Sequence, residues 1–115
     1  MPRAKSIAAI RHRKVKKAAK GFKHSAGKRV RTSKEALLHA GQYAYVGRRL
    51  RKRDMRRLWI QRINAGLSQI EGAPKYSRFI NLLKIKNVDL DRKVLADLAV
   101  SDSNAFEKVV AFSNS

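Results

Sequence analysis

Residues Arg48 to Arg57 read RRLRKRDMRR, and seven of these ten side chains are Arg or Lys. The chain has no proline or glycine between Gly47 and Gly66, which favours a helix through this stretch. Successive helical residues are about 100° apart, so the seven cations cover well over half of the helix circumference. The remaining gap holds Leu50, Asp54 and Leu58, which is too little to be buried as a core face.

Such a charge run is most often a solvated helix face, but that interpretation fits poorly here. Opposite charges four residues apart stabilise a solvated helix, and like charges at that spacing destabilise it; Asp54 is the one acid in the run. Cations that point in many directions need anions in many directions, which the phosphates of a nucleic acid supply. Arginine predominates, and its planar guanidinium can bind phosphate through two hydrogen bonds and stack on bases. This favours structured RNA as the partner.

The excess of positive charge is confined to one part of the chain. The 115 residues carry a formal charge of +20 and have a pI near 11.4, which is typical of proteins that bind polyanions. Residues 1–62 account for +19 of this charge and residues 63–115 for the remaining +1. We therefore predict a basic RNA-threading arm over residues 1–58, called the cationic arm below, and a C-terminal globular helical domain over residues 59–115.

The sequence contains no signal for catalysis or for a bound cofactor. It has no cysteine, which excludes disulfides and thiolate metal ligands and suits a reducing compartment. The three histidines lack metal-binding spacing, and no glycine-rich loop follows a strand. Asp89, Asp91 and Asp97 are better explained as helix caps, first-turn charges and surface ion pairs than as a catalytic pair. We expect no enzyme activity, cofactor, metal or small-molecule substrate.

The sequence gives no membrane-spanning signal either, because its longest apolar runs are only a few residues long. Its N-terminus lacks the apolar segment of a signal peptide. The first residues share the basic, amphipathic character of a transit peptide, but the same charge pattern continues past residue 60. No broad apolar face lies opposite the cations, which argues against a membrane-active helix.

Turn and capping signals divide the N-terminal half into elements. We predict a helix over residues 7–20 that ends at Gly21. Residues 21–31 are expected to be irregular and extended, and unordered without a partner because little there can be buried. Thr32-Ser33-Lys34-Glu35 matches a capping box with Thr32 as the N-cap, so a long helix is predicted from there to about Ile70.

The second half of this long helix acquires an apolar face. Its members recur at helical spacing and are Met55, Trp59, Ile63, Gly66, Leu67 and Ile70. Three short helices are predicted after it, capped by Ser77, by Asp91, and by Asp102 or Ser103, with the first two ending at Lys86 and Val100. Their inward side chains are expected to be Phe79, Ile80, Leu83, Phe106, Val109, Val110 and Phe112. Strand-type alternation is absent, so the predicted fold is all-α, a long basic N-terminal helical arm plus a small C-terminal helical bundle.

Aromatic side chains among the cations are candidates for stacking on RNA bases. Tyr43 and Tyr45 differ by 200° in helix direction, so one core cannot hold both, and at least one is expected to contact RNA. Phe22 is a further candidate, whereas Trp59 heads the apolar face and is expected in the core. The predicted RNA-binding residues are Arg3, Lys5, Arg11, His12, Arg13, Lys14, Lys17, Lys20, Phe22, Lys23, Lys28, Arg29, Arg31, Tyr43, Tyr45, Arg48, Arg49, Arg51, Lys52, Arg53, Arg56, Arg57 and Arg62.

Ordered blocks of the chain resemble the bacterial-type large-subunit ribosomal protein L-twenty family over nearly the whole length. The matching blocks are Arg11-His12 with Lys14, Ala19–Phe22, Ala40–Ala65, Tyr76-Ser77, Phe79–Asn81, Asp91–Ala99 and Ala105-Phe106. Two places depart from the family pattern. Val46-Gly47 stand where Arg-Asp is expected, and Lys23-His24 stand where the family usually has a second aromatic residue and a glycine.

The resemblance implies an all-α protein whose arm threads through large-subunit (23S-type) ribosomal RNA and whose C-terminal helical domain lies on the same RNA. It implies a structural role in early assembly of the large subunit, with neighbouring ribosomal proteins as further partners, on a cytoplasmic or an organellar ribosome. The alternative that the residues leave open is a basic architectural DNA-binding protein. A reader of duplex DNA presents its cations on one face, which the Arg48–Arg57 stretch does not.

Overall fold

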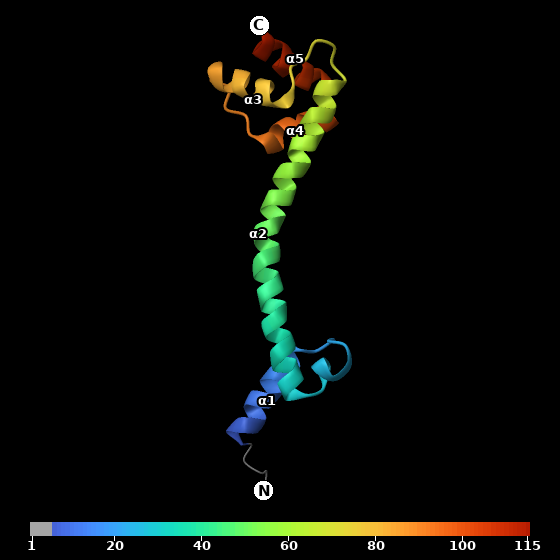
Figure 1. Ribbon diagram of the computed structural model, residues 1–115, viewed down its shortest axis with the longest axis vertical. Helices are drawn as coiled ribbons and strands as arrows, with labels where there is room; N and C mark the ends of the chain where they lie inside the picture. The colour runs from blue at the N-terminus through green and yellow to red at the C-terminus, as the bar shows by residue number, and fades with distance from the viewer. Residues whose placement is uncertain (1–5) are drawn as a thin grey trace. The chain divides into compact units, whose positions relative to one another are not determined.

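The computed structural model describes residues 6–115, and within them it contains helices and no β-strand (Figure 1). The elements in chain order are α1 (Ile7–Ala18), the short 3-10 helix η1 (His24–Gly27), α2 (Val30–Ser68), α3 (Tyr76–Ile85), α4 (Arg92–Ser101) and α5 (Ser103–Asn114). The predicted all-α class, with one long helix and a set of short C-terminal helices, is confirmed. The chain divides into two compact units, an N-terminal unit that ends at Arg49 and a C-terminal unit that begins at Leu50.

The first helix, α1, has well-defined ends but no buried side chain. At its start the hydroxyl of Ser6 accepts a hydrogen bond from the backbone N–H of Ala9 at 3.1 Å. After its end Gly21 adopts a φ of 89°, the left-handed conformation with which glycine terminates helices. The helix predicted over residues 7–20 is confirmed, although it ends two residues earlier.

The segment between α1 and α2 is compact, which corrects the extended conformation predicted for residues 21–31. A Cβ at position 27 would lie 2.7 Å from the carbonyl oxygen of Phe22, so Gly27 permits a close approach of two backbone segments. The buried hydroxyl of Ser33 donates to the carbonyl oxygen of Ala26 at 2.5 Å. Small side chains let two backbone segments pack closely here. The extended conformation was expected because the segment has few large apolar residues to bury, and that criterion does not detect packing of this kind.

The capping box predicted at Thr32 is wrong. Helix α2 begins at Val30, and the backbone N–H of Ser33 already donates to the carbonyl oxygen of Arg29 at 2.8 Å. Thr32 therefore lies inside the first turn, and Glu35 forms an ion pair with Arg31 instead of reaching back to Thr32. The far end of the helix, at Ser68, is two residues before the predicted one.

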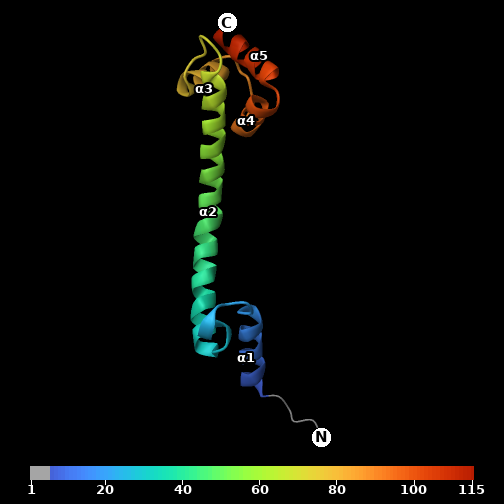
Figure 2. The same ribbon diagram turned by 90° about the vertical axis from the view of Figure 1, so that its right-hand side faces the viewer.

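The hydrophobic core belongs to the C-terminal unit, where α3, α4 and α5 gather around the last turns of α2 (Figure 2). Its buried members are Ile63, Leu67, Phe79, Leu83, Leu95, Ala96, Phe106 and Val110. The rings of Phe79 and Phe106 meet edge to face, with centroids 6.0 Å apart and planes at 65°, a favourable geometry for aromatic pairs. Trp59 and Ile70 pack against this core as partly buried residues, as the apolar face of α2 predicted.

Two of the three predicted caps of the short helices are confirmed. A side-chain oxygen of Asp91 accepts from the N–H of Val94 at 2.8 Å, and one of Asp102 accepts from the N–H of Ala105 at 3.0 Å. The prediction for Ser77 is wrong, because α3 already starts at Tyr76 and its N-cap, Lys75, makes no capping hydrogen bond through its side chain.

Two side chains predicted to face the core are exposed. Phe112 is 55% exposed, because it is two positions and thus about 200° around α5 from the buried Val110. The ammonium group of Lys86 lies 5.0 Å from the centroid of its ring. Met55 is 39% exposed, because it is one turn ahead of Trp59, where no other helix packs on α2.

Candidate nucleic-acid interface

The cations of α1 form a fully solvated set. These cations are distributed around a helix that buries no residue, and the helix contains no acidic residue. The predicted members that are exposed on α1 are Arg11, His12, Arg13, Lys14 and Lys17. Lys16 is exposed as well, so it belongs with this set although the prediction omitted it. An unpaired cationic helix of this kind presents charge to a polyanion from several directions.

The loop after α1 carries the next group of cations on a fixed backbone. Lys20, Lys23, Lys28 and Arg29 are exposed, and so is Arg31 at the start of α2. Their backbone is held in place by Gly27 packing on Phe22 and by the Ser33 hydroxyl, as described above. The side chain of Phe22 is half-buried, so it supports this loop and has less surface for base stacking than predicted.

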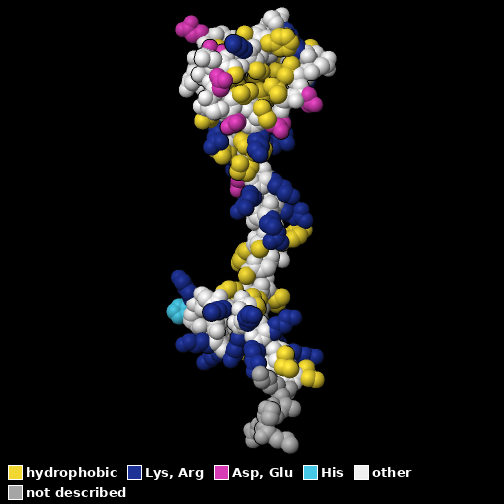
Figure 3. Space-filling model, turned by 180° about the vertical axis from the view of Figure 1, so that it is seen from behind, with side chains coloured by type: hydrophobic (Ala, Val, Ile, Leu, Met, Phe, Trp, Pro, Cys, Tyr) yellow, Lys and Arg dark blue, Asp and Glu magenta, His cyan; other side chains and the backbone are white. Residues whose placement is uncertain are grey.

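The basic stretch of α2 has no buried side at all. Every residue from Leu38 to Arg57 is exposed, and the seven cations between Arg48 and Arg57 therefore point into solvent around the helix. Arg62 is exposed one turn further on. Figure 3 shows one face of the molecule, on which Lys and Arg side chains gather over α1 and this stretch of α2, whereas most Asp and Glu side chains visible there lie on the part of the C-terminal unit that follows this stretch.

Almost none of this charge is neutralised within the protein. Among residues 6–115 the only ion pair is that between Arg31 Nε and Glu35 Oε1 at 3.8 Å. Both side chains are largely exposed, and an exposed pair of this kind contributes at most about 1 kcal/mol. Like charges four residues apart, such as Arg49 and Arg53, destabilise the isolated helix by roughly 0.2–0.5 kcal/mol per pair. An external polyanion would relieve this repulsion.

The two tyrosines of α2 are in different environments. The guanidinium carbon of Arg49 lies 4.3 Å from the ring centroid of Tyr45, and Arg49 also donates a hydrogen bond of 2.6 Å to its hydroxyl. Tyr43 is 73% exposed, and its ring stacks against His39 with centroids 6.3 Å apart. Tyr43 thus has more ring surface free for a base, whereas Tyr45 orients Arg49.

His39 stacks on Tyr43 within this candidate interface, and sequence reasoning did not single it out. The signal was present, since His39 precedes Tyr43 by four residues, the spacing at which helical side chains meet. Two predicted binding residues, Arg3 and Lys5, lie outside the described residues. No helix of the described part of the chain is long and apolar enough to cross a membrane. The same residues hold no cluster of three or more His, Asp or Glu side chains that could hold a metal ion.

Comparisons with known proteins give a consistent result. The family model described as Ribosomal protein L20 matches residues 3–109. A relative from Desulfovibrio desulfuricans is 53% identical over 100 residues, covering 87% of this chain and 83% of the relative. One from Nitrosomonas eutropha is 51% identical over 111 residues, covering 95% and 92% respectively. Both relatives bear the name large ribosomal subunit protein bL20.

Proposed function

Because this chain belongs to the ribosomal protein L20 family, we propose that its cationic arm binds large-subunit ribosomal RNA directly and thereby supports assembly of the subunit. As a member of this family, the chain is a structural protein of the large ribosomal subunit and not an enzyme. Its site of action is the ribosome. The other ribosomal proteins beside it are further proposed partners.

The single observation that carries the proposal is the exposure of α2 on all sides between Leu38 and Arg57. A helix that binds one flat or convex surface needs cations on one face only. Here Arg51 and Arg53 point about 160° apart around α2, and Arg48 and Arg57 point about 180° apart, so their anions must surround the helix. Strands of a folded RNA can do so, because their phosphates approach from several directions.

The proposed mechanism is charge neutralisation between RNA segments. Phosphate groups that converge at a junction repel one another, and each exposed guanidinium or ammonium group placed between them lowers that repulsion. Release of the counterions that the phosphates had condensed adds to the binding free energy. Arginine side chains also fix orientation, because their fork binds a phosphate through two parallel hydrogen bonds. The junction is thereby held in one geometry during assembly.

A salt titration of the full chain with a transcript of large-subunit ribosomal RNA tests the proposal. We expect the log–log slope of the binding constant against salt to steepen by roughly 0.7–0.9 for each phosphate neutralised. Binding at fixed salt should be tighter than to duplex DNA of equal length. A flat titration, or equal affinity for both nucleic acids, would contradict direct and RNA-directed binding.

A matched pair of variants locates the binding on the arm. Lys52→Gln with Arg53→Gln removes two exposed cations from α2, and the slope should fall by about 2. Arg78→Gln with Lys93→Gln removes an exposed arginine from α3 and an exposed lysine from α4 and should change the slope by less than 1. If the second pair has the larger effect, the arm is not the main phosphate-binding element.

A further inference from the structure

One side of the basic stretch of α2 carries no positive charge. At about 100° per residue, four side chains lie within an arc of about 80°, and they are Leu50, Asp54, Leu58 and Gln61. We call these four residues the cation-free stripe. The buried residue Ile63 points about 180° away from Asp54, so the stripe faces away from the hydrophobic core. Leu50 is 43% exposed, and Asp54 and Gln61 are exposed as well, so a partner can reach the stripe.

Cations border the cation-free stripe on both sides. Relative to the direction of Asp54, Arg51 and Arg62 lie about 60° and 80° to one side. Arg57 and Arg53 lie about 60° and 100° to the other side. All four arginines are exposed. This arrangement suits a partner that has anions along two edges and an uncharged, hydrogen-bonding surface between them.

Asp54 is the one acid of the stretch, and its carboxylate has no ionic partner within the described residues. Arg51 and Arg57 are three residues away, a spacing at which helical side chains meet. Even so, the only ion pair of residues 6–115 joins Arg31 and Glu35. A free carboxylate in a stretch that binds phosphates is repelled by them. It is therefore compatible with such a partner only where it faces a hydrogen-bond donor.

The minor groove of an RNA helix meets both requirements. In A-form RNA this groove is wide and shallow, and it displays the ribose 2′-hydroxyls along with the base edges. A hydroxyl can donate a hydrogen bond, and an ionised carboxylate can only accept one. The phosphates of the two strands border the groove. Because DNA has no 2′-hydroxyl, a contact with this group distinguishes RNA from DNA.

We propose that the cation-free stripe of α2 lies on the minor groove of a ribosomal RNA helix, where the carboxylate of Asp54 accepts a hydrogen bond from a ribose 2′-hydroxyl. The arginines on either side of the stripe bind the phosphates of the two strands. Phosphate contacts position the protein and carry no information about the sugar beside them. Asp54 is thereby the residue of this stretch that determines specificity for RNA.

This inference rests on the proposed function and deepens it, because it names the groove and the chemical group that one side of α2 contacts. It also predicts an effect opposite in sign to that of charge alone. Removal of a negative charge from a protein that binds a polyanion should strengthen binding. If Asp54 accepts a hydrogen bond from the ribose, its removal should weaken binding instead, and only binding to RNA.

The experiment compares the full chain with its variants at one salt concentration, on a transcript of large-subunit ribosomal RNA and on duplex DNA of equal length. We expect Asp54→Ala to weaken RNA binding by roughly tenfold, as for the loss of a hydrogen bond to a charged group, and not to weaken DNA binding. Asp54→Asn keeps an acceptor oxygen and should lose less. Asp97→Ala removes an exposed carboxylate from α4 and is the matched control, which should weaken neither.

A modified transcript identifies the donor. When fluorine replaces the 2′-hydroxyl groups, the ribose donors are lost while the amino groups of the bases remain. The unchanged chain and Asp54→Ala should then bind this transcript with equal affinity. A tenfold difference that persists on the fluorinated transcript would show that Asp54 contacts a base and not a ribose, which would overturn the proposal.

A purely structural role of Asp54 gives a different result. If the carboxylate only reduced repulsion among its neighbouring cations, both variants would lose helicity, and binding to RNA and DNA would weaken alike. Circular dichroism measures the helicity. Unchanged or tighter binding of Asp54→Ala to RNA, or an equal loss on both nucleic acids, would overturn the proposal. Each result leaves the salt titration of the unchanged chain intact, so failure of this contact is distinguishable from failure of RNA binding as such.

Discussion

Helix α2 belongs to two different environments. From Leu38 to Arg57 every side chain is exposed, whereas Ile63 and Leu67 near its end are buried among α3, α4 and α5. The first region is helical although its apolar side chains, such as Leu38 and Leu50, stay exposed and like charges four residues apart oppose the helix. The second has an interior that includes two phenylalanine rings in contact. The hydrophobic effect therefore stabilises only the second region, and we propose that an external partner stabilises the first.

The largest expected effect comes from the buried Phe106 on α5, and the exposed Phe112 on the same helix is its control. Phe106→Ala should lower the free energy of unfolding of the C-terminal unit by about 3–5 kcal/mol, because it empties a fully packed site in the core. Urea denaturation followed by circular dichroism measures this loss. Phe112→Ala removes the same side chain from an exposed position and should cost less than about 1 kcal/mol. Equal losses from the two variants would mean that the core is not where the structure places it.

A smaller effect compares the same substitution at two places on α2. Gly66→Ala would set a Cβ 2.9 Å from the ring of Phe106 and 3.0 Å from Cβ of Ala99. The packed ring cannot move freely, so we expect a loss of about 1–3 kcal/mol. Gly41→Ala meets no atom within 4 Å and should increase helicity, because alanine favours a helix by up to about 1 kcal/mol over glycine.

Gly47→Ala also meets no atom within 4 Å, so it should increase helicity in the same way as Gly41→Ala. The three variants are compared by urea denaturation for the C-terminal unit and by ellipticity at the helical band for the arm. A stabilising Gly66→Ala, or a loss of helicity in both arm variants, would contradict the different environments assigned to the two regions of α2.

Helix capping gives an effect of about 1 kcal/mol that is restricted to the C-terminal unit. Asp102→Ala removes the acceptor for the N–H of Ala105 and should destabilise this unit by roughly 0.5–2 kcal/mol. Asp97→Ala also removes one negative charge from an exposed position, but Asp97 caps no helix, so its effect should be close to zero. Thermal unfolding of both variants at one salt concentration gives the comparison, and equal shifts in Tm would argue that charge, not capping, is responsible.

The smallest expected effect lies in the loop of the N-terminal unit. His24 adopts a φ of 56°, a left-handed conformation that is strained for residues with a Cβ. His24→Gly relieves this strain but increases the freedom of the unfolded chain, so we expect a net gain of a few tenths to about 1 kcal/mol. Hydrogen exchange of the backbone amides of Lys28 and Arg29 measures this gain in loop stability, because both amides donate to the carbonyl oxygen of Ser25. Faster exchange in the variant would show that His24 is not strained.

The fold class and most of the core could be predicted from the sequence, because they follow from local periodicity. Trp59, Ile63 and Leu67 recur at helical spacing, and the aspartates before α4 and α5 act as caps in the way their chemistry predicts. The core prediction failed at Phe112, because this residue lies about 200° around α5 from the buried Val110. Helical periodicity, applied to this pair, would have placed Phe112 outside the core.

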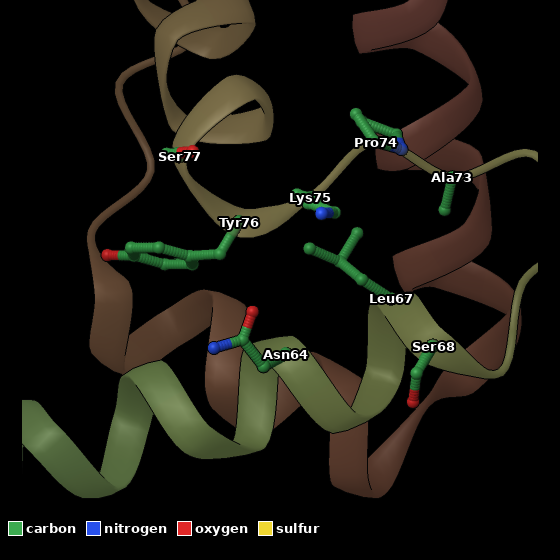
Figure 4. A pocket seen from close by; sticks show the side chains of 8 residues that line it. All are labelled: Asn64, Leu67, Ser68, Ala73, Pro74, Lys75, Tyr76 and Ser77. Atoms are coloured by element: carbon green, nitrogen blue, oxygen red, sulfur yellow. The ribbon is translucent and has the colours of Figure 1, made fainter.

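The loop and a cavity in the C-terminal unit could not be predicted in the same way. The loop depends on a backbone approach at Gly27 and on one hydroxyl, Ser33, that bonds seven residues back. The cavity between the end of α2 and the start of α3 is lined by residues that are apart in the sequence, such as Asn64 and Tyr76 (Figure 4). Neither leaves a periodic pattern in the sequence. The arm boundary predicted at residue 58 stays a prediction, as do the individual RNA contacts.

Hydrogen exchange of the full chain, alone and with the ribosomal RNA transcript, tests the central claim most directly. We predict that the amides of α1 exchange nearly as fast as an unfolded chain in the free protein, because this short helix buries nothing, and become protected on RNA. The amides around Phe79 and Phe106 should be protected in both states. Strong protection of α1 in the free protein, or no change on adding RNA, would contradict the dependence of the arm on an external polyanion.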